Sequence, residues 1–83
     1  MVHNEWLKAD YALGKVSSVI GKKIIKAIAI IRMINNAQVY ACTKEYIRLA
    51  AGLSKEPIDQ AFGELEKIGI IEYKVRTNSY SFK

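Results

Sequence analysis

The sequence predicts an α+β fold that is mainly helical, with a helical core and a small antiparallel sheet near its C-terminal end. Residues 24–34 are almost entirely apolar, which is typical of a helix at the centre of a domain. After Gly69 the spacing of apolar residues changes from helical to alternating. Alternation with period 2 indicates strands that have one buried face. A buried helix followed by a hairpin explains both patterns.

The first expected helix covers residues 4–13, where Trp6 and Leu13 belong to a helically spaced apolar set. Residues 14–21 contain two glycines and a pair of serines. Such residues interrupt a helical pattern and favour a flexible joint. We therefore expect residues 1–16 to be an N-terminal helical appendage of a single domain.

The main helix is expected over residues 22–34, with Ile24, Ile28 and Ile31 on one stripe. Its apolar residues extend almost all round, so it should lie at the centre of the core. Two asparagines end this helix, and residues 38–42 then predict a short extended segment.

Two further helices follow, separated by a tight turn. Thr43 is expected to cap the first of them, and Gly52 to end it. Ser54 should cap the second, in which Pro57 is tolerated because the first turn leaves its amides unpaired. Gly69 supplies the left-handed residue that ends this last helix.

The final residues predict a β-hairpin. If residues 77–78 form its tip, Val75 lies opposite Tyr80 and Tyr73 lies opposite Phe82. These four side chains would then share the buried face of the hairpin. The three aromatic ones could instead stack on nucleic-acid bases, but their alternation along the strands favours burial. The polar residues of the hairpin share the other face, and they are Lys74, Arg76, Ser79 and Ser81. Thr77 is a poor turn residue, so a loop that is one or two residues wider is the alternative.

This order of helices and strands is that of a winged helix-turn-helix, in which the hairpin is the wing. Residues 23–31, 65–74 and 78–82 resemble the winged-helix segment that follows the nucleotide-binding module in large bacterial P-loop ATPases of the AAA+ and signal-transducing kind. The resemblance covers residues 22–83, which would form the winged-helix core. It implies that the chain is a fragment or regulatory domain of a longer protein. A strand that ends at Lys83 agrees with this.

The resemblance does not imply ATPase activity, because the sequence has no Gly-x-x-x-x-Gly-Lys-Ser/Thr phosphate loop. We expect no enzymatic function, no cofactor, no metal site and no small-molecule substrate. His3 is the only histidine and lies near a chain end. Glu64 and Glu66 point in different directions on a helix, so they do not form a carboxylate pair.

The composition fits one cytoplasmic domain of 83 residues. The only cysteine, Cys42, cannot form an intramolecular disulfide and is expected to be a small buried residue. The beginning of the chain lacks the features of a signal peptide. The apolar stretch over residues 24–34 is far shorter than the roughly 20 residues that a bilayer requires, so no membrane partner is expected.

Thirteen basic and eight acidic residues give a net charge of +5, which favours a polyanionic partner such as DNA. However, the helix after Ser54 is acidic, which argues against its insertion into a major groove. We therefore expect DNA binding mainly through the basic wing. The candidate nucleic-acid-binding residues are Lys44, Arg48, Lys55, Gln60, Lys74, Arg76 and Asn78. The alternative is a regulatory module that packs on a neighbouring ATPase or repeat domain and binds no DNA.

Overall fold

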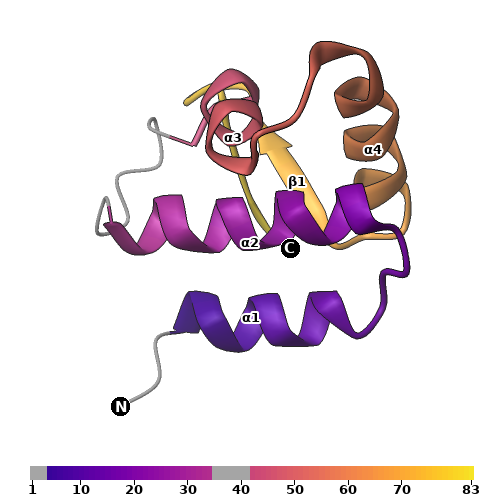
Figure 1. Ribbon diagram of the computed structural model, residues 1–83. Coiled ribbons are helices and arrows are strands. Elements are labelled where there is room, and N and C mark those ends of the chain that lie inside the picture. Colours follow the sequence, from indigo (N-terminus) through magenta and orange to yellow (C-terminus); the bar gives the residue numbers. More distant parts are fainter. Residues whose placement is uncertain (1–3, 35–41) are drawn as a thin grey trace.

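The computed structural model describes residues 4–34 and 42–83, and these contain four helices and one two-stranded antiparallel sheet (Figure 1). The elements are α1 (Asn4–Leu13), α2 (Val19–Ile34), α3 (Lys44–Ala51), α4 (Lys55–Lys67), β1 (Ile71–Lys74) and β2 (Ser79–Phe82). The mainly helical α+β class is confirmed. None of the helices in these two ranges is long and apolar enough to cross a membrane.

Helix α2 begins at Val19, three residues earlier than the sequence suggested. Ser18 explains the earlier start, because its hydroxyl oxygen accepts a hydrogen bond of 3.2 Å from the Gly21 backbone amide. Part of the expected joint is thus helical, and Gly21 is buried within α2. Helix α1 runs alongside α2 (Figure 1) and buries Ala9 and Ala12 in the core, so the expected appendage is packed onto the domain.

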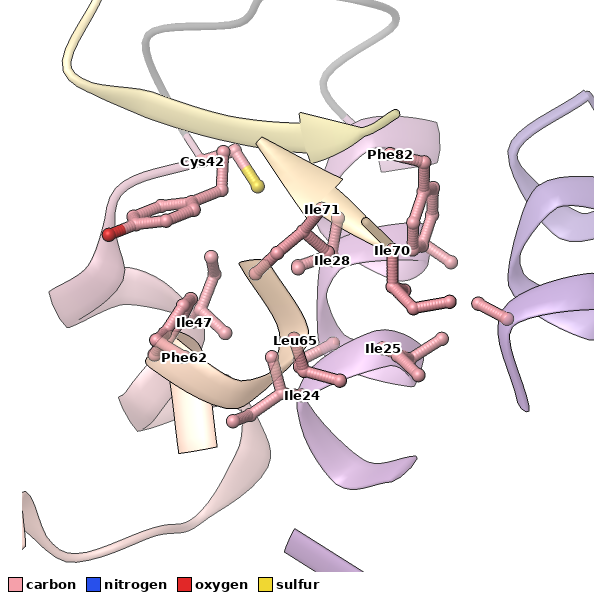
Figure 2. Close-up of a cluster of buried hydrophobic side chains, with 14 of the residues drawn as sticks. Ile24, Ile25, Ile28, Cys42, Ile47, Phe62, Leu65, Ile70, Ile71 and Phe82 are labelled. Carbon is pink, nitrogen blue, oxygen red and sulfur yellow. The ribbon is translucent and has the colours of Figure 1, made fainter. Parts of the chain in front are cut away.

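The centre of the core is α2, as predicted. Ile24, Ile25 and Ile28 have no exposed surface. Figure 2 shows these side chains gathered with Leu65 of α4 and Ile71 of β1. Cys42 is also fully buried in this cluster, as expected for a small apolar side chain.

The α3–α4 turn is fixed by local hydrogen bonds. The Thr43 hydroxyl accepts from the Tyr46 amide at 3.2 Å, which confirms the predicted cap. Gly52 has a φ of 69°, and the next amide, that of Leu53, donates to the Arg48 carbonyl at 3.0 Å. Ser54 has the expected extended backbone but accepts no cap hydrogen bond, so that part of the prediction is wrong.

Helix α4 ends as predicted. Gly69 follows it with a φ of 78°, and the Ile70 amide donates back to the Leu65 carbonyl at 3.0 Å. This is the hydrogen bond of a Schellman motif, which needs a left-handed residue at the glycine position. The end of the helix also exposes Ile68, which the periodicity had placed on the packed face.

The predicted register of the hairpin is wrong by two residues. Tyr73 pairs with Tyr80 rather than Phe82, and Ile71, expected to lack a partner, pairs with Phe82. The cause is a four-residue loop over residues 75–78, closed by a hydrogen bond of 3.2 Å from the Asn78 amide to the Val75 carbonyl. A two-residue tip would have required Val75 to pair with Tyr80, whereas Val75 is 80% exposed.

Strand β2 is buried along its whole length, contrary to the expectation of one polar face. The Tyr80 amide donates to the Cys42 carbonyl at 2.8 Å, and Arg32 donates to the Tyr80 carbonyl at 3.4 Å. Its second edge is therefore occupied at Tyr80, and Ser79 and Ser81 are buried. The extended segment expected over residues 38–42 lies outside the described residues except for Cys42.

Candidate nucleic-acid interface

The seven candidate residues lie on two parts of the molecule. One group, on α3 and α4, contains Lys44, Arg48, Lys55 and Gln60, and the other, on the hairpin, contains Lys74, Arg76 and Asn78. The first three residues of the α3–α4 group line one surface pocket of about 290 Å³ together with Glu45, Ile58 and Asp59. The structure therefore brings three predicted cations together, but it places two carboxylates among them.

Lys44 is engaged by α4. Its ammonium group donates to Asp59 Oδ1 at 3.0 Å and lies 5.4 Å from the centre of the Phe62 ring. The hydrogen bond to Asp59 raises the pKa of Lys44 above its ordinary value of 10.5. The pair is partly open to solvent, so its contribution to stability is about 0 to 1 kcal/mol. Its main effect is that Lys44 already has an anionic partner.

Arg48 makes more hydrogen bonds within the protein than Lys44 does. Its guanidinium group donates to both carboxylate oxygens of Glu45, and Nη1 donates to the Leu53 carbonyl at 3.1 Å. The hydrogen bonds from Arg48 hold the pKa of Glu45 below its ordinary value of 4.5, and the nearby charge of Lys55 lowers it further. Arg48 therefore fixes the α3–α4 turn, and Lys55 is the least neutralised cation of this pocket.

The outward face of α4 is acidic and polar, as the sequence predicted. Gln60 is exposed there, and its amide donates to Glu64 Oε1 at 3.5 Å. The other exposed side chains of the helix include Glu56, Asp59, Glu66 and Lys67. A major groove has phosphates along both sides, so this surface would be repelled by duplex DNA.

The hairpin presents its cations differently. Lys74 ends β1 and Arg76 lies in the loop, and both side chains are exposed. Within residues 4–34 and 42–83, neither has a carboxylate within 4.0 Å or a side-chain hydrogen bond. These two cations are therefore available to phosphates, unlike Lys44 and Arg48.

Asn78 shapes the loop. It has a left-handed backbone with a φ of 49°, which asparagine tolerates better than most residues. Its side-chain oxygen accepts a hydrogen bond of 2.5 Å from the Tyr73 hydroxyl. Asn78 thus has a structural part in the wing, and its contact with nucleic acid stays a prediction.

Tyr73 is the residue of this surface that sequence reasoning missed. Alternation placed it on the buried face, yet it is 40% exposed. Its ring stacks at 5.0 Å, in a tilted arrangement, on Tyr80, which in turn packs at 4.6 Å on Phe62. The ring therefore exposes one edge of a cluster of three aromatic side chains that reaches into the core at Phe62. The signal that would have identified it is its place near the loop on β1, which has only one neighbouring strand.

Comparisons with known proteins identify no relative. No family model, no curated protein and no solved structure matches this chain.

Proposed function

We propose that this domain is a winged helix-turn-helix that binds the phosphate backbone of duplex DNA through its hairpin, without inserting α4 into the major groove. The order of α3, a glycine turn, α4 and a hairpin supports this fold assignment. The acidic outer face of α4 accounts for the absence of groove insertion. Contacts to phosphates position a protein on DNA but carry no sequence information, so binding should be indifferent to sequence.

A single observation carries this proposal. The hairpin cations Lys74 and Arg76 are exposed and unpaired within the described residues, whereas Lys44 and Arg48 are neutralised by Asp59 and Glu45. A cation that already has a carboxylate partner must lose that partner before it can bind a phosphate. The hairpin can bind without such a loss.

The test is the salt dependence of binding to a short fluorescent DNA duplex, measured by anisotropy between about 50 and 200 mM salt. We expect the Lys74→Ala/Arg76→Ala variant to bind duplexes of different sequence more weakly by the same factor. The slope of log K against log salt should decrease by about 2, because each lost phosphate contact releases roughly one fewer counterion.

The matched control is Lys22→Ala/Lys23→Ala, which removes the same charge from exposed positions near the start of α2. In Figure 1 the start of α2 and the loop of the hairpin lie on opposite sides of the molecule. The control should keep the slope of the unmodified protein. Equal losses in both variants would show that net charge alone drives binding, and no binding even at the lowest salt would eliminate the DNA-binding proposal.

The acidic face of α4 favours a second function, in which the domain docks on a basic surface of a neighbouring domain such as an ATPase or repeat domain. Three exposed carboxylates of this helix have no ion-pair partner in the described residues and would pair with such a surface, and they are Glu56, Glu64 and Glu66. The fourth, Asp59, already pairs with Lys44. In that case the hairpin substitutions should have no effect on DNA. Duplex affinity at about 150 mM salt should then be no tighter than the roughly 0.1 mM of weak non-specific contacts.

A further inference from the structure

Helix α2 exposes a stripe along its whole length on the side opposite the core. The stripe consists of Val19, Lys23, Lys26, Ile30 and Ile34, and we call it the α2 outer stripe. Steps of three and four residues place these side chains on one face of a helix. At 1.5 Å per residue the stripe extends roughly 22 Å.

The apolar side chains of this stripe are exposed to solvent. Val19 is 67% exposed, Ile30 44% and Ile34 74%. The opposite side of α2 fills the core with Ile24, Ile25 and other fully buried residues. The stripe therefore carries apolar side chains outside the core, one at its start and two at its end.

The charge of the stripe has one sign. Helix α2 contains Lys22, Lys23, Lys26 and Arg32 but no aspartate or glutamate. Its three lysines are exposed and have no ion-pair partner within residues 4–34 and 42–83. Within the described residues, the stripe thus has one valine at its start, two lysines without an ion-pair partner in its middle and two isoleucines at its end.

These features select among the surfaces that could cover α2. A phosphate backbone would pair with Lys23 and Lys26 but would leave Ile30 and Ile34 in water. A second copy of the same stripe would bury the isoleucines but would gather the lysines of both copies in one interface without a carboxylate, and like charges repel. A helix that carries apolar side chains and carboxylates at the same spacing satisfies both requirements.

We propose that the α2 outer stripe is the docking surface for an acidic amphipathic helix of a partner. The apolar residues of that helix would pack on Val19, Ile30 and Ile34, and its carboxylates would pair with Lys23 and Lys26. This surface is distinct from the hairpin, and the proposal does not depend on DNA binding.

The probe is a synthetic fluorescent peptide with leucine at three- and four-residue spacing and glutamate at the flanking positions. Its control is the same peptide with lysine in place of glutamate. Anisotropy with the full chain should show saturable binding of the acidic peptide only. The Val19→Asp/Ile34→Asp variant should weaken this binding at least tenfold, because two apolar contacts are lost and two repulsive charges are gained.

The matched substitution is Leu49→Asp on α3, because Leu49 is 64% exposed and lies outside the stripe. This variant should bind the acidic peptide as tightly as the unmodified protein does. Circular dichroism of all variants would show that each is folded. An unlabelled DNA duplex should not displace the peptide, and vesicles rich in phosphatidylserine should not bind through the stripe.

Several results would overturn the proposal. These are no binding of the acidic peptide at millimolar concentration, equal binding of the lysine peptide, or an equal loss in the Leu49→Asp variant. Displacement of the peptide by duplex DNA would instead assign the stripe to nucleic acid. Vesicle binding that disappears in the Val19→Asp/Ile34→Asp variant would assign it to a membrane surface.

Discussion

The packing of α2 predicts that Ile28→Ala is severely destabilising. Ile28 has no exposed surface and lies in the core cluster with residues of α4 and β1 (Figure 2). The substitution removes three carbon atoms, which at about 0.8 kcal/mol for each buried methylene is roughly 2.5 kcal/mol of transfer free energy. Packed helices and a sheet around the site limit its collapse, so a cavity adds to this loss. We expect a total of about 3 to 4 kcal/mol, within the usual range for such changes.

The measurement is unfolding in urea followed by far-ultraviolet circular dichroism, with Trp6 fluorescence as a second probe. The matched control is Ile34→Ala, the same substitution in the same helix at a side chain that is 74% exposed. It should lower the free energy of unfolding by less than about 0.5 kcal/mol. A domain of 83 residues has a total of about 4 to 12 kcal/mol, so Ile28→Ala is measurable. Equal effects of the two substitutions would refute the central position of α2.

Two further predictions concern caps and pH. Thr43→Ala should cost about 1 kcal/mol of unfolding free energy, because it removes the hydrogen bond to the Tyr46 amide, whereas Ser54→Ala should cost clearly less, because Ser54 makes no such bond; urea unfolding compares the two, and equal costs would contradict the assignment. Burial raises the pKa of Tyr80 above its ordinary value of 10.0. The folded state therefore keeps this proton longer than the unfolded state, and stability should fall as the pH rises above about 10. This loss of stability should be smaller in Tyr80→Phe, which has no phenol to titrate. Thermal melts of both proteins at pH 9 to 11 measure it, and an equal loss in the two proteins would contradict the prediction.

The helices were predictable because their ends and faces are encoded locally. Thr43, Gly52 and Gly69 each act within one turn of their own position. The apolar period of residues 22–34 likewise indicates the central helix from the sequence alone. The start of α2 is less predictable, because a serine such as Ser18 is equally typical of a flexible joint and of a helix cap.

The burial of β2 was not predictable because it depends on residues distant in the sequence. Ser79 and Ser81 look like a solvated face, yet the second edge of β2 contacts Cys42 and Arg32. A small hydroxyl tolerates burial when it has a partner, and Ser79 has one in Thr77 at 2.7 Å. The buried Ser81 hydroxyl has no hydrogen-bond partner within the described residues, so a partner does not explain its burial. The pairing of Lys44 with Asp59, fifteen residues away, is likewise invisible to a count of charges.

The error in the hairpin register has a limited effect on the candidate interface, and the reason is geometric. A shift of two residues preserves which face each side chain occupies, because the period of a strand is two. Lys74 therefore lies on the predicted polar face in either register, and it is exposed in the structure. The wider loop changes the backbone that carries the cations. The strand pairing ends with Lys74 and Ser79, so Arg76 lies in the loop rather than in a strand. The two cations are thus held by a strand end and a loop. Such an arrangement suits contacts with phosphates, whose spacing is the same for every sequence, better than the reading of base edges.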